Sequence, residues 1–189
     1  MFNPVTILIL INVVVYFIPY LFSFGYNQEQ SFQNFLALGW KSNELIRDGE
    51  YYRLLSSTFL HGSLTHLFLN MFSLYQVGPA VLSYFKTPGF LAIYLLSGLG
   101  GSVLSYIYNP GPSVGASGAI FGLVGALVSL SVLTNSYGML NNLILVIVLN
   151  FAFSFSPNSG IDNFGHIGGL LTGIFVGGVL LKLNPGILN

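Results

Sequence analysis

Two side chains able to catalyse acyl transfer stand near the starts of two apolar segments, Ser117 and His166. Ser117 lies in the run GASGAIFG, directly after a break rich in proline and glycine, so its small neighbours leave the hydroxyl accessible. A hydroxyl that meets an imidazole is the minimum for nucleophilic catalysis, with the histidine acting as general base and then as general acid. The alternative is structural: Ser117 caps a helix, and His166 is an interfacial histidine held by a hydrogen bond.

A second polar cluster lies in the run HGSLTHLFLN at residues 61–70. His66 and Asn70 are four residues apart, so they share a helix face, and both can donate hydrogen bonds to a developing oxyanion. His61 lies roughly 140° from His66 around a helix that extends that far. This angle disfavours zinc binding by the histidines, and the sequence has no HExxH motif. We expect no metal site and no cofactor.

The chain that carries these residues is too poor in charge to form a water-soluble surface. Only 5% of its 189 residues are charged and 53% are hydrophobic, whereas soluble domains carry roughly 25% charged residues. The formal net charge is zero and no basic patch is present, which excludes nucleic acid as a partner. The lack of cysteine excludes disulfides, thiolate metal sites and a cysteine nucleophile.

The spacing of the charges predicts an all-α, polytopic membrane protein. Seven of the ten charged residues lie between Glu29 and Arg53, and the charge-free stretches are long enough for bilayer spans of about 20 apolar residues. Proline and glycine clusters divide the longest stretch. We expect one domain over residues 1–189, a large external loop over 25–57, and six helical spans at about 4–24, 64–85, 90–108, 117–134, 141–156 and 163–181, with Asp162 or Asn163 capping the last.

Six spans place both ends of the chain on one side of the membrane. With cytoplasmic ends, Lys86 and Lys182 lie inside without an acidic residue beside them, as the positive-inside rule favours. The large loop, with three basic and four acidic residues, then lies outside. A bacterial plasma membrane is the expected location.

Small residues predict how the two reactive side chains meet. They recur every four positions on two of the expected spans: Gly165, Gly169, Gly173 and Gly177 on the sixth, and Gly118, Gly122 and Ala126 on the fourth. Such faces let helix backbones approach closely within lipid. If the two faces meet, Ser117 and His166 stand beside the seam at the same end of the helix pair.

Taken together and in this order, the three motifs resemble those of the rhomboid intramembrane serine proteases. The resemblance covers about residues 4–182 and implies a six-helix core without a seventh helix. It implies Ser117 as nucleophile and His166 as general base, without a third acid. It also implies an oxyanion hole made by His66, Asn70 and the backbone amide of Ser117.

The same resemblance implies four supporting residues. His61 corresponds to a histidine that hydrogen-bonds the large first loop. Gly169 and Gly173 correspond to the motif that packs the sixth helix on the fourth. Gly115 belongs to the motif that carries the nucleophile.

Two positions depart from the commonest bacterial pattern of the family. Phe121 stands where a tyrosine often stacks on the catalytic histidine, so the ring can pack on His166 but has no hydroxyl. Tyr52 and Arg53 replace a Trp-Arg pair. They are either an interfacial aromatic with a solvated or headgroup-bound charge, or a pair with a specific role in the loop. Asp162 is expected to belong to the external loop.

The implied function is intramembrane endopeptidase activity on single-pass transmembrane protein substrates, near the outer face of the lipid bilayer. Such substrates need helix-weak, small residues there, because a helix hides its peptide bonds. Two alternatives are an inactive rhomboid-like protein that binds membrane clients, and a small transporter, which usually needs an intramembrane ionisable residue. The sequence carries no signal for the oligomeric state.

Overall fold

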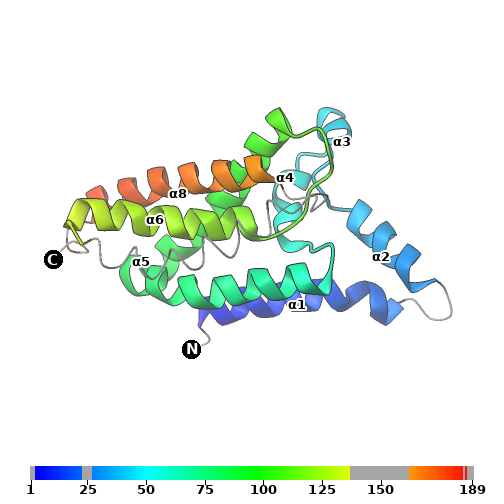
Figure 1. The fold of residues 1–189 in the computed structure, drawn as a ribbon, viewed down its shortest axis with the longest axis horizontal. Coiled ribbons are helices and arrows are strands. Elements are labelled where there is room, and N and C mark those ends of the chain that lie inside the picture. The colour runs from blue at the N-terminus through cyan, green and yellow to red at the C-terminus, as the bar shows by residue number, and fades with distance from the viewer. Residues whose placement is uncertain (1–2, 23–26, 137–161, 185, 187–189) are drawn as a thin grey trace.

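Four long apolar helices dominate the computed structural model, which describes residues 3–22, 27–136, 162–184 and 186. They are α1 (Pro4–Phe22), α5 (Leu64–Tyr108), α6 (Ser117–Thr134) and α8 (Asn163–Leu183), and each is long and apolar enough to cross a bilayer. In Figure 1, α5, α6 and α8 pack against one another, and α1 packs on α5. Within the described ranges the only extended pairing is one bridge, between Lys41 and Ser113.

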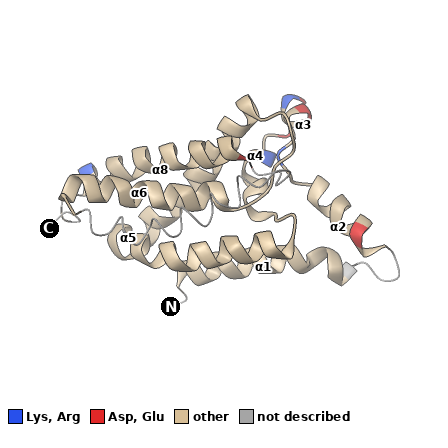
Figure 2. Ribbon diagram, viewed as in Figure 1, with Lys and Arg blue, Asp and Glu red and all other residues tan. Residues whose placement is uncertain are grey.

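Short helices fill the connection between α1 and α5. They are α2 (Gln28–Ala37), α3 (Asn43–Arg47), α4 (Arg53–Ser56) and the 3-10 helix η1 (Ser57–Phe59). Figure 2 shows most of the charged residues at one end of the molecule, and seven of the ten lie in this connection, on the short helices or between them. α6 and α8 begin at this same end. The charge cluster and the predicted positions of Ser117 and His166 therefore share one end of the bundle.

The helices lie on five of the six expected spans, with ends close to those predicted. α6 covers residues 117–134 as expected, and α8 runs two residues beyond 181. Asp162 caps α8 by accepting a hydrogen bond from the Gly165 amide, which confirms the predicted cap. The fifth expected span, 141–156, lies outside the described residues, so the count of six stays a prediction.

One helix, α5, contains both the second and the third expected span. Its only non-helical residue is Lys86, with φ 55° and ψ 177°. The break expected between the two spans therefore lies at the predicted position, but it is a kink at one residue and not a loop. Pro88 follows in the first turn of the second half, where its missing N–H costs no helical hydrogen bond. The chain therefore changes direction and resumes a helix at once.

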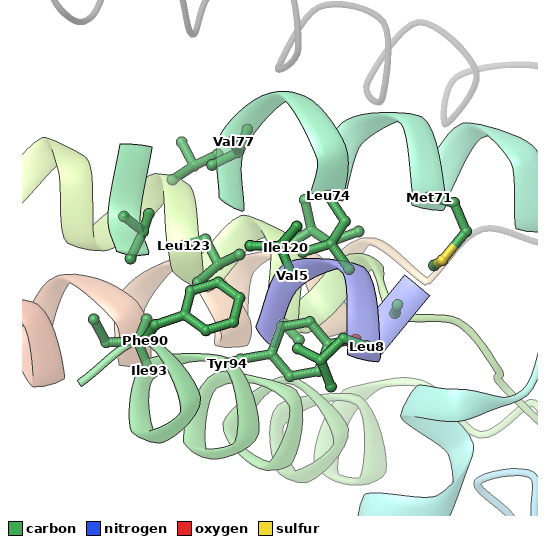
Figure 3. Close-up of a cluster of buried hydrophobic side chains, with 14 of the residues drawn as sticks. Val5, Leu8, Met71, Leu74, Val77, Phe90, Ile93, Tyr94, Ile120 and Leu123 are labelled. Carbon is green, nitrogen blue, oxygen red and sulfur yellow. The ribbon is translucent and has the colours of Figure 1, made fainter. Parts of the chain in front are cut away.

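The buried core lies where α1 and the two halves of α5 meet α6 (Figure 3). Its members include Val5 and Leu8 of α1, Leu74, Val77, Phe90 and Tyr94 of α5, and Ile120 and Leu123 of α6. Large apolar side chains are also exposed on the outside, among them Leu21, Phe68, Tyr75 and Phe175. An exposed apolar surface of this extent is suited to lipid, not to water.

The glycine faces of α6 and α8 meet as predicted. A Cβ added at Gly169 would overlap the carbonyl of Gly118, and one added at Gly173 would overlap the carbonyl of Gly122. One turn further, a Cβ at Gly177 would lie 2.8 Å from the Cα of Ala126. The two helices run parallel in this register, so their first turns lie side by side.

Candidate active site

Ser117 and His166 are in direct contact at the start of this seam. His166 Nε2 lies 2.8 Å from Ser117 Oγ. Ser117 is the first residue of α6 and His166 lies in the first turn of α8. His166 is buried. In the tautomer with a bare Nε2, the serine hydroxyl donates to the imidazole, which is the arrangement that a general base requires.

The backbone that leads into Ser117 passes directly against His66. Gly115 has φ +132°, and a Cβ there would lie 2.8 Å from His66 Nε2. The same Cβ would lie 3.7 Å from Ser117 Oγ. Only glycine fits this position, because of both its conformation and its close approach to the ring. The structure thus brings Gly115, His66 and Ser117 together.

Asn70 lies one turn after His66 on the same face of α5, as predicted. Its amide nitrogen donates to the His66 carbonyl at 2.9 Å. An amide NH2 has two protons, and this is the only bond that Asn70 Nδ2 makes among the described residues. Asn70 is buried. The remaining N–H has no partner among the described residues, so it can donate a hydrogen bond to another group.

Phe121 stacks on His166, one turn after the serine. The ring centroids lie 4.6 Å apart with an angle of 24° between the planes. The prediction that this ring packs on His166 without a hydroxyl is confirmed. Stacking restrains the imidazole plane, so Nε2 stays directed at Ser117.

His61 differs from its expected arrangement. α5 begins at Leu64, so the helical angle used to separate His61 from His66 does not apply, and the two rings touch edge to face with centroids 5.2 Å apart. His61 is buried beside the Phe59 main chain, but neither ring nitrogen has a hydrogen-bond partner among the described residues. The Phe59 main chain still acts on this ring as a hydrogen-bonding group, so the implied bond from His61 to the first loop stays a prediction. Burial, with a smaller effect of His66, lowers the pKa of His61 to about 3, so this ring is neutral.

Arg53 has a specific role in the first loop, which decides between the two interpretations of the Tyr52-Arg53 pair. Its side chain is buried and donates to the carbonyls of Ala37 (2.9 Å) and Trp40 (3.2 Å). It also forms an ion pair with Glu50, with a nitrogen–oxygen distance of 2.6 Å. Tyr52 donates to the same carboxylate at 2.9 Å. The guanidinium is therefore neither solvated nor available to headgroups.

Asp162, the cap at the start of α8, belongs to the polar surroundings of the site; its expected place in an external loop stays a prediction, because residues 137–161 lie outside the described residues. It is half-buried, and it accepts hydrogen bonds from the Ser105 hydroxyl and the Gly165 amide. Burial alone would raise the pKa of its carboxyl, but these hydrogen bonds outweigh burial and hold the pKa below its usual value. The cap was visible in the sequence. The bond to Ser105 was not, because Ser105 lies 57 residues earlier.

Two cavities adjoin Ser117 and His66. A small one of about 30 Å³ is lined by Ser117, Asp162 and mostly small or hydroxyl-bearing residues, including Ser57, Thr58, Ser102 and Ser113. A larger one of about 420 Å³ borders His66, and its walls include Gln33, Leu36, Trp40, Gly62 and Pro112. The contribution of α2 and Trp40 to this larger pocket had no sequence signal, because no motif connects them to His66.

Comparison with known proteins decides the family. The family model described as the Rhomboid domain matches residues 48–183. The chain belongs to the rhomboid family. It is 41% identical to "Rhomboid protease GluP" of Bacillus subtilis over 152 residues, and these aligned residues cover 78% of this chain and 30% of that protein. With its long apolar helices, this rhomboid chain is an all-α polytopic membrane protein.

Other rhomboid relatives differ in what their names state. "Rhomboid-like protease 2" of Toxoplasma gondii is 30% identical over 192 residues, which cover 98% of this chain and 68% of that protein. "Inactive RHOMBOID-like protein 8" of Arabidopsis thaliana is 37% identical over 144 residues, which cover 72% of this chain and 39% of that protein. The chain thus spans well under two thirds of the Bacillus and Arabidopsis proteins. Family membership alone does not decide activity, so the site must be judged on its own geometry.

Proposed function

We propose that this rhomboid protein is an intramembrane serine endopeptidase in which Ser117 is the nucleophile and His166 the general base. The observation that carries the proposal is the 2.8 Å contact between Ser117 Oγ and His166 Nε2. A relative named as a protease supports it. The stacked Phe121 and the close approach of Gly115 to His66 add the restraint that a preorganised site needs.

The geometry supports a stepwise acyl transfer. His166 Nε2 takes the Ser117 proton while Oγ attacks the scissile carbonyl carbon, and the carbonyl π electrons move onto oxygen. His66, Asn70 and the Ser117 backbone amide are the donors for that oxyanion. The imidazolium then protonates the departing amine as the C–N bond breaks. A water molecule, deprotonated by His166, releases the acyl group and restores the serine.

Water and substrate both need a route to the serine. The small cavity beside Ser117 has polar walls and about 30 Å³ of space, enough for a water molecule. A peptide bond must leave its helix before the serine can attack it, so we infer single-pass membrane substrates with small, helix-weak residues near the site. Lys86 and Lys182, which have no acidic residue beside them in the sequence, favour cytoplasmic chain ends in a bacterial plasma membrane and so an outer-face position of the site.

The test is labelling by a fluorophosphonate, together with cleavage of a model single-pass substrate in liposomes. Wild-type protein should label and cleave, and Ser117→Ala and His166→Ala should reduce both to background. Ser83→Ala is the matched control, because Ser83 is an exposed serine in α5 whose hydroxyl bonds only the Ala80 carbonyl among the described residues. Cleavage that survives Ser117→Ala would refute the assignment. A folded wild type that neither labels nor cleaves would indicate a client-binding protein instead.

A further inference from the structure

A buried lysine lies at the same end of the bundle, outside the proposed catalytic machinery. Lys41 has 0% of its surface exposed. Its ammonium donates to the carbonyls of Asn109 (2.7 Å) and Gly111 (2.6 Å) and to the side-chain oxygen of Asn43 (3.1 Å). All three protons are thus used. Among the described residues no carboxylate lies within ion-pair distance of it.

A buried ammonium without a carboxylate partner is costly, so its contacts require an explanation. Two of the three acceptors are main-chain carbonyls of residues 109–116, the connection between α5 and α6. The lysine reaches them across 68 and 70 positions of sequence. The buried ammonium of Lys41 thus restrains the connection that leads to Ser117, although its desolvation opposes folding.

Further bonds fix the same connection to the first loop. The backbones of Lys41 and Ser113 pair in both directions, at 2.9 and 3.2 Å. The Asn43 amide donates to the carbonyls of Tyr106 (2.9 Å) and Asn109 (3.2 Å). These contacts hold both the last turn of α5 and the middle of the connection.

The far side of the connection is tied to the helix that carries His166. Ser113 Oγ lies 3.4 Å from Ser105 Oγ, and Ser105 donates to Asp162, the cap of α8. Burial lowers the pKa of the Lys41 ammonium, whereas the negative charge of Asp162 acts to raise it. The connection thus lies between a cation on the first loop and an anion at the start of α8.

Small movements of this connection would reach the reacting atoms. Gly115 is held by a 2.9 Å bond from its amide to the Ser57 carbonyl, and its backbone lies against His66. Ser117 follows two residues later. A misplacement of about 1 Å can cost roughly 10²-fold in rate. Releasing the carbonyls at 109 and 111 would loosen the position of Ser117 relative to both His66 and His166.

We propose that Lys41 is a positioning residue for the nucleophile: its ammonium clamps the connection before Ser117 and so aligns the serine with His66 and His166. This inference rests on the proposed protease function. The competing explanation is that Lys41 only stabilises the fold. The two differ in whether the chemical step slows while the protein remains folded.

The central experiment compares Lys41→Met with wild type at a temperature well below both unfolding midpoints. Methionine keeps much of the apolar stem and removes the ammonium. We expect the fluorophosphonate labelling rate and kcat for a single-pass substrate to fall about 10-fold or more, with KM within about twofold. The reason is that Ser117 loses its alignment with His66 and His166, whereas the groups that bind the substrate are retained. Lys86→Met is the matched control, since Lys86 is exposed and bonds only the nearby Ser83 carbonyl among the described residues. It should leave both rates unchanged.

Rescue separates positioning from general stability. Lys41→Arg restores a cation with several donors and should recover part of the labelling rate, incompletely because a guanidinium cannot reproduce the ammonium geometry. If Lys41→Met lowers the unfolding midpoint but labels at the wild-type rate while folded, the proposal is wrong. A raised KM with unchanged kcat would also overturn it, since the lysine would then serve substrate binding.

A second variant covers the case in which Lys41→Met does not fold. Asn43→Ala removes the amide bonds to the same connection at a half-buried position. It should reduce labelling in the same direction but less, and a wild-type rate in the folded variant would contradict the clamp. Failure of the protease proposal itself looks different, because wild type and Lys86→Met would then also fail to label.

Discussion

The flat contact between Phe121 and His166 is the clearest case of a side chain that controls another at this site. In the proposed mechanism, His166 accepts a proton from Ser117 and later delivers it, so the imidazole ring has to keep its orientation while its charge changes. The Phe121 ring, stacked with its centroid 4.6 Å from that of His166, restrains the imidazole orientation by packing alone. The hydroxyl that tyrosine would add at this position is therefore not part of the restraint.

Substitutions at Phe121 test this restraint. We expect Phe121→Leu to lower kcat by about 2- to 10-fold, because aromatic pairs contribute roughly 0.5–1.5 kcal/mol beyond their buried area. Phe121→Tyr should stay within about twofold of wild type. Cleavage assays in liposomes measure both, with fluorophosphonate labelling as a second readout. A leucine variant as fast as wild type would show that stacking does not orient His166.

At the residue scale, sequence patterns reveal groups with distinctive chemistry and miss those whose partners are backbone. Ser117 and His166 stand out because their motifs contain glycine and lie at the starts of apolar segments. Lys41 and Arg53 do not, since they bind carbonyl oxygens, which every residue carries. Contacts across 68 positions, such as Lys41 to Asn109, leave no trace in local spacing.

The parallel seam between α6 and α8 is the element that places the two reactive groups. Its register was predictable because a four-residue repeat of small residues has one physical use in lipid, close helix packing. The continuity of α5 was not predictable, because the sequence has the composition of a loop from Lys86 to Gly89. Proline is tolerated in the first turn of a helix, so the second half of α5, which contains Pro88, begins without a connecting segment.

Filling the seam should separate the helices. A Cβ at Gly173 would overlap the Gly122 backbone, which cannot move aside as a flexible side chain could. We expect Gly173→Ala to destabilise the protein by about 1–3 kcal/mol, as overpacking does, and to reduce labelling of Ser117. Gly178→Ala is the control on the same helix, because its Cβ would lie 3.9 Å from Ser129 Oγ in ordinary contact. Equal thermal midpoints for the two variants would contradict the seam.

The cap of α8 predicts a pH dependence of stability. The folded state holds the pKa of Asp162 below its usual value, so ionised Asp162 stabilises the fold above the ordinary Asp pKa of about 3.9. That stabilisation is lost as the pH falls through the lower folded-state pKa. Asp162→Asn keeps a capping side chain but cannot ionise. Its thermal midpoint should lie below that of wild type at pH 7, and the gap should narrow on acidification. A gap that stays constant between pH 7 and pH 3 would argue against this role.

The whole molecule is asymmetric along the bundle. The connection between α1 and α5 carries most of the charges, at the end where α6 and α8 begin (Figure 2), whereas the last turn of α8, at the other end, carries Lys182. Composition alone predicted the membrane and the charge cluster. The pocket between α2 and α5 could not be predicted, because it depends on how the first loop folds back over His66.

The chain has no cysteine, so its orientation can be tested by single-cysteine labelling. Glu44 and Lys182 are both exposed, on α3 and on the last turn of α8. In intact cells a membrane-impermeant maleimide should label Glu44→Cys directly, and Lys182→Cys only after permeabilisation. This follows from the positive-inside rule. The reverse pattern would place the proposed site on the cytoplasmic face.

Main chain meets main chain where Gly118 and Gly122 face Gly169 and Gly173. No side chain lies between the two helices at these positions, so a change of rotamer cannot adjust the distance between their backbones. Separation of α6 from α8 would therefore also separate Ser117 from His166. In the proposed mechanism, a substrate that enters through another part of the bundle leaves the alignment of Ser117 and His166 unchanged.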